Sequence, residues 1–324
     1  LESRKAERAE KGAAFSKQDA QILKILKSRE SQANQLMNDS PAQYYYTYEK
    51  NEELPALALD DPTMLKKQIE ERRTIAINYN REPKIFTGAE INKFKGAMQA
   101  GDSLGVANFL GAILNAAPNV DRLQILDELG LKTDAKEIAH IAAIDRTPGF
   151  TKVRDFMDAG KKLDPTFGVS AVDFQRTAGN AFLGAKSSDR EVIKDVAKRL
   201  FISRHGAIYD STKMTAILHE VVGGDQNTGG FLKYKGNTII VPMGVERSTD
   251  AIEAKLQMFA QDVEEMVDDG VPFPGYQTKS GFKPVPADEL EKAELISYGT
   301  GTYYLKIDDK FVQSSDGTRF MLQL

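Results

Sequence analysis

Residues 103–115 read SLGVANFLGAILN, and their apolar side chains face almost every direction around a helix. Ser103 is a typical N-cap residue for that helix. A helix without a polar face packs in the centre of a bundle of helices. Pro118 ends it, and a second apolar helix over 120–129 is followed by Gly130, which supplies a C-terminal cap. This stretch therefore predicts a mainly helical protein.

Helical spacing and start signals extend this prediction upstream. An amphipathic helix with Ile22, Ile25 and Leu26 runs to about Asn38. Asp61-Pro62 is an N-cap followed by proline at the first helical position, and it opens a helix that continues to Tyr79. On that helix, Glu70, Glu71, Arg72 and Arg73 predict a solvated face. Thr87 and Glu90 form a capping box that begins the next helix.

Short helices joined by short connectors continue downstream, which predicts an antiparallel helical body. We expect them at residues 138–144, 153–157, 172–182, 192–200 and 214–222. No fixed repeat period is present, which argues against a solenoid.

The pattern changes after His205. Residues 231–234 and 238–241 predict a β-hairpin with its turn at 235–237, and a helix over 252–267 follows. A Pro/Gly-rich loop is expected from Gly270 to Pro286. The end of the chain predicts a small antiparallel meander, with strands at 295–298, 303–307, 311–312 and 320–322.

The predicted fold class is therefore mainly α, a multi-helix body with a small C-terminal α+β element made of the hairpin and the meander. We expect three sections: N-terminal helices and a linker at 1–82, a helical domain at 83–205, and a C-terminal α+β domain at 206–324. A chain of this length exceeds one average domain, which agrees with such a division.

Composition narrows the function. Asp and Glu number 47 against 43 Lys and Arg, and a net charge of -4 argues against a dedicated reader of duplex DNA. The absence of Cys excludes disulfides and thiolate metal sites. No apolar run is long enough for a transmembrane segment. Because the chain begins Leu1-Glu2, we interpret it as a piece of a longer polypeptide.

Five clusters resemble possible sites, and each has a simpler structural interpretation. His219-Glu220 lacks the second histidine of a zinc-protease helix and predicts a surface pair. The glycines at 223–230 lack the lysine of a P-loop and predict a mobile loop. Basic residues near the middle predict a salt-bridged helix end, with phosphate contact as the alternative. They are Arg199, Arg204, His205 and Lys213.

An acidic cluster near the end of the 252–267 helix predicts a solvated helix end, with a cation or partner site as the alternative. It contains Asp262, Glu264, Glu265, Asp268 and Asp269. The tyrosines between 44 and 48 predict rings that pack on a neighbouring element, with base stacking as the alternative. No complete catalytic constellation is visible, so we predict no catalytic, cofactor-binding or metal-binding residue in this chain.

Four stretches, taken in their order along the chain, carry a resemblance to a known family. One is the segment from Asp39 through the helix that ends IAINY at 75–79, and another is FTGAEI at 86–91. The third is LHEVVGG at 218–224, followed by KYKGNTIIVP at 233–242. The last is GTYYL at 301–305 with DGTRFMLQL at 316–324. In this order they resemble the C-terminal region of the large internal virion, or DNA-ejection, proteins of tailed bacteriophages.

The resemblance implies a non-enzymatic structural or assembly module. Such a protein is packaged in the virion and delivered with the genome into the host envelope or cytoplasm. Its expected partners are other virion proteins or further copies of itself, with weak contact to DNA left open and no small-molecule substrate. Some members of the family also carry a lytic transglycosylase domain, but its Glu-Ser signature is not completed after Glu30-Ser31.

Two alternatives remain at this point. The chain could be a fragment of a peptidoglycan-degrading enzyme that uses carboxylates, which a turbidity assay on peptidoglycan would detect. It could instead be a nucleic-acid-binding module, whose affinity would fall steeply with salt.

Overall fold

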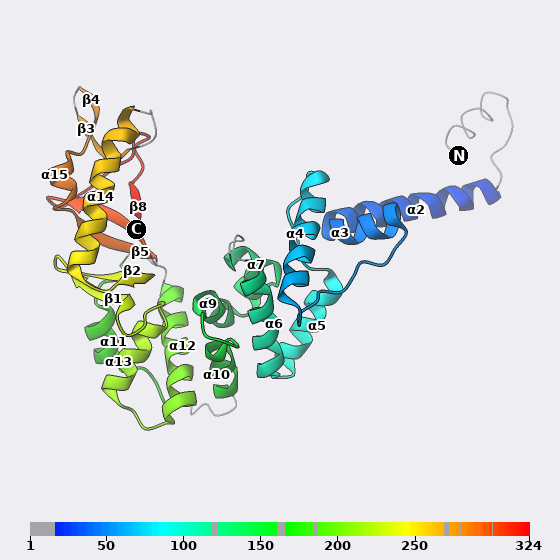
Figure 1. Cartoon of the computed structure of the whole chain (residues 1–324), viewed down its shortest axis with the longest axis horizontal. Coiled ribbons are helices and arrows are strands. Elements are labelled where there is room, and N and C mark those ends of the chain that lie inside the picture. The colour runs from blue at the N-terminus through cyan, green and yellow to red at the C-terminus, as the bar shows by residue number, and fades with distance from the viewer. Residues whose placement is uncertain are drawn as a thin grey trace. The chain divides into compact units, whose positions relative to one another are not determined.

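The computed structural model describes residues 17–117, 122–160, 166–183, 187–268, 273–278, 280–299 and 301–324 (Figure 1). The chain forms two compact units, Leu1–Thr133 and Asp134–Leu324. This single division falls inside the expected section 83–205, and the boundaries at 82 and 205 stay predictions.

Helices alone build the described part of the first unit. They are α2 (Lys17–Asp39), α3 (Pro41–Tyr44), the π-helix η1 (Tyr45–Lys50), α4 (Pro62–Asn78), α5 (Gly88–Gln99), α6 (Ser103–Ala116), α7 (Arg122–Glu128) and the start of α8 (Leu131–Asp134). The central helix is α6, as the sequence predicts, because Val106, Leu110 and Ile113 on it are fully buried.

Two of the expected caps of this unit are confirmed, whereas the prediction of Ser103 as the N-cap of α6 is wrong, because Asp102 is the N-cap and accepts the backbone N–H of Gly105. Asp61 accepts hydrogen bonds from the backbone N–H groups of Thr63 and Met64 at the start of α4. Thr87 and Glu90 make both hydrogen bonds of a capping box at the start of α5. These local signals work because the side chains satisfy backbone donors that the first helical turn leaves open.

The prediction of a solvated face at Arg72 is wrong. The Arg72 side chain is 3% exposed, and its guanidinium contacts both carboxylate oxygens of Glu90 at 2.8 and 3.1 Å. It also donates to the carbonyl oxygens of Pro55 and Ile85, each at 2.7 Å. Arg72 is thus a buried connection between α4, the preceding loop and the start of α5. Its pairing with the Glu90 carboxylate offsets the free-energy cost of removing the charged guanidinium from water.

The second unit begins with a helical part. It contains α9 (Lys136–Ile144), α10 (Thr151–Ala159), α11 (Ala171–Ala178), α12 (Ser187–His205) and α13 (Ser211–Glu220). The α+β part follows with β1 (Thr228–Tyr234), β2 (Asn237–Glu246) and α14 (Thr249–Asp268). Lys235 and Gly236 both have positive φ, at 43° and 81°, which makes the two-residue turn that the hairpin pattern predicts.

The interval from 270 to 286, predicted as a loop, contains a second hairpin. Its strands are β3 (Gly275–Thr278) and β4 (Gly281–Pro284), paired antiparallel, and residues 269–272 and 279 lie outside the described residues. Short strands rich in Gly and Pro carry little periodic signal, so a hairpin of this kind escapes pattern analysis.

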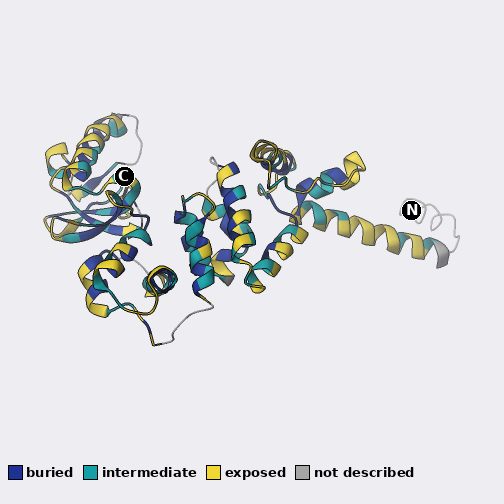
Figure 2. Ribbon diagram, turned by 60° about the horizontal axis from the view of Figure 1, so that its bottom comes forward, coloured by how far each residue is buried: buried dark blue, intermediate teal, exposed yellow. Residues whose placement is uncertain are grey.

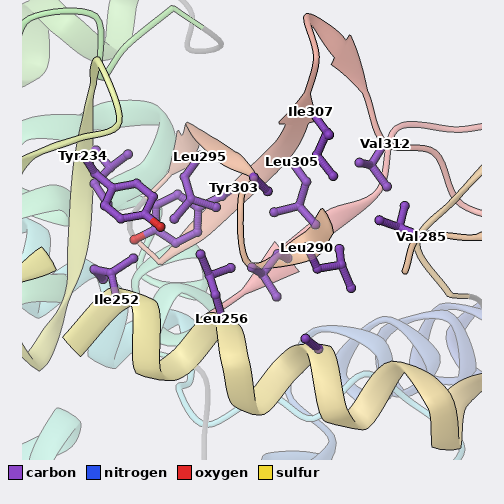
Figure 3. Close-up of a cluster of buried hydrophobic side chains, with 14 of the residues drawn as sticks. Tyr234, Ile252, Leu256, Val285, Leu290, Leu295, Tyr303, Leu305, Ile307 and Val312 are labelled. Carbon is purple, nitrogen blue, oxygen red and sulfur yellow. The ribbon is translucent and has the colours of Figure 1, made fainter. Parts of the chain in front are cut away.

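The chain ends in α15 (Ala287–Leu290) and four strands, β5 (Glu294–Gly299), β6 (Thr302–Ile307), β7 (Lys310–Phe311) and β8 (Met321–Gln323). These strands correspond to the four predicted ones, but β8 returns to pair with β6 beside β7. Their inner side chains meet α14 in one apolar core, in which Leu256, Leu295 and Leu305 are fully buried (Figure 3). The predicted fold class, mainly α with a small C-terminal antiparallel element, is confirmed.

None of the helices in the described ranges combines the length and apolar character needed to cross a membrane.

Candidate functional site

The terminal sheet has one buried face and one face turned away from the core. Along β6, Tyr303, Leu305 and Ile307 are buried, whereas Thr302, Tyr304 and Lys306 alternate with them and remain partly exposed. This is the period-two pattern of a strand with one covered face. The sheet therefore holds the outward side chains on a rigid, packed base.

Aromatic rings gather on the outward face. The Tyr304 ring lies 5.2 Å from that of Tyr298 and 6.1 Å from that of Phe311, measured between centroids. The guanidinium carbon of Arg319 lies 4.2 Å from the Phe311 centroid and 5.7 Å from that of Tyr304. Met321 is the cross-strand partner of Tyr304. We call these five residues, Tyr298, Tyr304, Phe311, Arg319 and Met321, the outer aromatic face.

Two turns bring these residues together. Asp308 and Asp309 both have positive φ, at 48° and 63°, and they join β6 to β7 so that Phe311 reaches Tyr304. Asp316 accepts hydrogen bonds from the backbone N–H and the hydroxyl of Thr318, at 2.9 and 2.7 Å. That second turn sends the chain back to β6 and places Arg319 over the rings.

Charge on the outer aromatic face comes from Arg319. The neighbouring Lys306 ammonium already pairs with Asp309 at 2.5 Å and with Glu294 at 3.8 Å. The hydrogen bond with Asp309 raises the pKa of Lys306 and lowers that of Asp309. Arg319 has no carboxylate partner among the described residues, so it holds a cation over aromatic rings that a ligand could contact.

Much of this face is accessible. Tyr298 is 50% exposed and Met321 is 53% exposed, and both belong to the same group of side chains on one face. Aromatic, Met and Arg side chains are enriched where proteins bind one another. The arrangement can therefore bind a partner, and nothing in it resembles a nucleophile with its base.

The structure gives His219 and Glu220 structural contacts, and neither is the exposed surface residue that the sequence suggests. The His219 Nδ1 atom accepts the backbone N–H of Phe231 at 3.1 Å, next to Arg247. Burial and the Arg247 charge lower the pKa of His219 to about 4, so the ring is neutral at pH 7. Glu220 pairs with Arg204 at 2.6 Å and with Lys152 at 3.3 Å.

The glycine-rich segment 223–230 is tied to its surroundings, in contrast to the mobile loop expected from its sequence. Asp225 accepts the backbone N–H groups of Asn227 and Thr228, at 2.9 and 2.7 Å. Arg247 donates to the carbonyl oxygens of Gln226 and Gly229, at 2.7 and 3.1 Å. The backbone N–H groups that a phosphate-binding loop would offer to a ligand are thus bonded to Asp225 here.

The other clusters have the structural roles that the sequence predicts. Arg204 bridges Asp155 and Glu220, and Arg199 pairs with Asp195 at 2.8 Å, which confirms the predicted salt bridges for these two residues of the basic group. His140, by contrast, is partly buried, and its Nε2 atom lies 2.6 Å from the carbonyl oxygen of Val221. Desolvation lowers its pKa.

In the acidic cluster, Asp262 and Glu265 are exposed on α14. The side chains of Glu264 and Asp268, and all of Asp269, lie outside the described residues. Within those residues, no group of three or more Asp, Glu or His side chains could hold a metal ion.

The tyrosine-rich segment packs on α4, which confirms the preferred interpretation. The Tyr46 hydroxyl donates to Glu71 at 2.7 Å, and the Tyr44 ring lies 5.7 Å from that of Tyr79 in an edge-to-face arrangement.

The outer aromatic face itself was missed by sequence reasoning beyond the general expectation of a docking element at the end of the chain. The outward positions of Tyr298 and Tyr304 in their two strands follow from the alternating pattern of the sequence. No local pattern, however, indicates that β8 brings Arg319 and Met321 beside them.

Comparison of the chain with models of protein families, with curated proteins and with solved structures found no match.

Proposed function

We propose that this chain is a structural or assembly module of a tailed-bacteriophage virion protein that takes part in genome ejection or in penetration of the host envelope. It binds another virion protein through the outer aromatic face. The phage context rests on the family resemblance of the sequence. The single observation that carries the binding role is the group of exposed aromatic, Met and Arg side chains on the terminal sheet.

A protein partner fits this face for two reasons. Tyr and Arg are the side chains that most often dominate the binding energy of protein interfaces. Moreover, the rings sit on strands whose opposite side chains are buried, so little conformational entropy is lost when a partner binds.

Single-stranded nucleic acid is the other ligand that stacks on such a platform. The surrounding charges do little to attract it. Asp308, Asp309 and Asp316 in the turns next to the face are balanced by Lys306, Lys310 and Arg319, and the chain as a whole is acidic. A nucleic-acid site usually shows an excess of basic residues.

The test is co-expression of the full chain with each structural protein encoded beside it in the phage genome, followed by purification and mass photometry. We expect one of them to co-purify, and Tyr298→Ser combined with Arg319→Ala to reduce that binding at least about tenfold, since this pair supplies central contacts. Tyr48→Ser is the matched control, because Tyr48 is 51% exposed in the other unit and Tyr298 is 50% exposed.

The proposal fails if no structural protein binds, or if Tyr48→Ser weakens binding as much as the double variant does. Retention of the chain on single-stranded DNA at low salt, lost in the Tyr298→Ser and Arg319→Ala variant, would instead identify a nucleic-acid-binding module.

A further inference from the structure

Strand β8 lies at an edge of the terminal sheet. It pairs with β6 alone, and no other described strand pairs with its free side. The backbone N–H of Leu324 donates to the carbonyl oxygen of Gly301, at the end of β8 that meets β6. In an antiparallel strand, consecutive residues direct their backbone groups to opposite sides. Met321 and Gln323 therefore direct theirs away from β6, and no hydrogen bond joins these groups to another residue of the described chain.

Other strand edges of this unit are protected against a further strand. The backbone N–H of Phe231 on β1 donates to His219 of α13. The strand β4 contains Lys283 and Pro284, residue types that discourage pairing at an edge. Residues 320–324, by contrast, read FMLQL and contain no charge, glycine or proline. Natural proteins usually protect an edge of this composition, so its free backbone groups point to another strand that covers it.

The side chains of this segment are incompletely covered on both faces of the sheet. Near the end of the chain, marked C in Figure 2, buried and exposed residues alternate along the strands, and within 320–324 only Leu322 is buried. Phe320 and Leu324 pack against the core of the unit but stay partly exposed. On the opposite face, Met321 and Gln323 are both exposed. A strand added beside β8 would cover side chains on both faces.

A second copy of β8 is complementary to this edge when it runs antiparallel and the two-fold axis passes between the two Leu322 residues. Met321 of each copy then lies opposite Gln323 of the other, where opposite residues exchange both backbone hydrogen bonds. Every outward N–H and C=O group of the two segments is thereby paired. Phe320 of each copy lies opposite Leu324 of the other, and each covers the other on the inner face. A segment without charges also brings no like charges together across the axis.

We infer that two copies of this chain associate by antiparallel pairing of β8, which joins their terminal sheets into one continuous sheet. This goes beyond the proposed function, because the pairing requires no other virion protein. Both copies use the same surface, so the association closes at a dimer. The two-fold axis stands perpendicular to the joined sheet, and both outer aromatic faces therefore lie on the same side of it.

Paired charges test the association. Sedimentation equilibrium of the full chain should show monomer and dimer. Met321→Lys combined with Gln323→Lys places lysine opposite lysine and should weaken association at least about tenfold. Met321→Lys combined with Gln323→Glu places opposite charges there and should return it to within about threefold of the wild type. Gln277→Lys combined with Ser315→Lys, at two exposed positions elsewhere in this unit, adds the same charge as the lysine pair and is the matched control.

Single cysteines test the register, since the chain has none of its own. When Met321→Cys chains are mixed with Gln323→Cys chains, the two cysteines lie directly opposite each other, within the geometry that a disulfide requires. The mixture should therefore form disulfide-linked dimers under mild oxidation. Each variant alone should not, because two copies of the same residue then lie diagonally and too far apart for a disulfide.

A chain that stays monomeric at every concentration overturns the inference. So does a lysine pair at 321 and 323 that dimerises as well as the control, a lysine–glutamate pair that stays weak, or cross-linking by either cysteine variant alone as readily as by the mixture.

The proposed function is tested separately. The Tyr298→Ser and Arg319→Ala variant should still dimerise, because neither residue lies in the pairing segment. A monomeric chain that still binds a structural protein through the outer aromatic face loses only the β8 pairing.

Discussion

Two tyrosines in the core of the second unit differ in what their hydroxyls contact. The Tyr303 hydroxyl donates to the carbonyl oxygen of Ile240 at 2.6 Å. The Tyr234 hydroxyl is buried and has no hydrogen-bond partner in the described chain, and burial raises the pKa of Tyr234 to about 12. Both rings lie in the apolar core against α14 (Figure 3).

Removing these hydroxyls should have opposite effects. Tyr303→Phe leaves the Ile240 carbonyl unpaired and should lower the free energy of unfolding by about 1 kcal/mol, whereas Tyr234→Phe should leave it unchanged or raise it by up to about 1 kcal/mol. Urea denaturation of the two variants measures the difference. Equal destabilisation by both would show that the Tyr234 hydroxyl does have a partner.

Glu128 should make stability depend on pH. Its Oε1 atom accepts the backbone N–H groups of Ile85 and Phe86, at 2.8 and 2.6 Å. Burial nevertheless raises the pKa of Glu128 to about 7, from 4.5. The folded state thus favours the protonated form of the Glu128 carboxyl group. The contribution of this group to the free energy of unfolding is fully present below pH 4.5 and is lost as the pH rises through about 7.

We therefore expect the free energy of unfolding of the wild-type protein to fall by about 3 kcal/mol between pH 4 and pH 8, relative to that of the Glu128→Gln variant. The glutamine keeps a hydrogen-bond acceptor at this position but cannot ionise. Comparing the two proteins cancels the other titrating groups. The exposed neighbour Asp127, changed to Asn, is the control and should follow the wild type. A Glu128→Gln difference that is constant across this pH range would contradict the prediction.

At the scale of elements, two glycines, one in β1 and one in the turn that follows it, distinguish two ways in which an added side chain would destabilise the fold. One is backbone strain and the other is steric overlap. Both Gly229 and Gly236 have positive φ, but a Cβ on Gly229 would lie 2.5 Å from the carbonyl oxygen of Gly223. At Gly236 nothing lies within 4 Å of that position. The backbone of the 223–230 segment cannot move away without breaking its bonds to Asp225 and Arg247.

Gly236→Ala should cost roughly 1 kcal/mol, from the left-handed backbone alone. Gly229→Ala should cost at least roughly 3 kcal/mol, because the steric overlap is added to the same backbone term. Thermal unfolding of the two variants measures both values. Similar values for the two would mean that the 223–230 segment adjusts freely, as a mobile loop does.

At the scale of the whole molecule, the two compact units predict two unfolding events. Each unit has its own buried residues, such as Leu65 and Leu110 in the first and Leu256 and Leu305 in the second. A unit with its own core can fold alone. Calorimetry of the full chain should show two transitions, and the fragment 134–324 should reproduce one of them. One two-state transition, with an unfolded fragment, would contradict this.

The sequence by itself determined the features whose physical cause is local. The caps at Asp61 and Thr87, the buried helix α6 and the turn at Lys235-Gly236 each depend on contacts within a few residues, so composition and spacing predict them. The strands of the terminal sheet could be predicted from alternation in the same way.

Only the tertiary structure decided features that join distant residues. Arg72 is buried because Glu90, 18 residues later, compensates its charge. Glycines at 223–230 are tied by Arg247, and the outer aromatic face forms because β8 returns to β6. Such contacts depend on which backbone lies nearby in space. A pattern along the chain does not contain that information, since the same charged or aromatic residue is equally suited to a solvated face until folding supplies its partner.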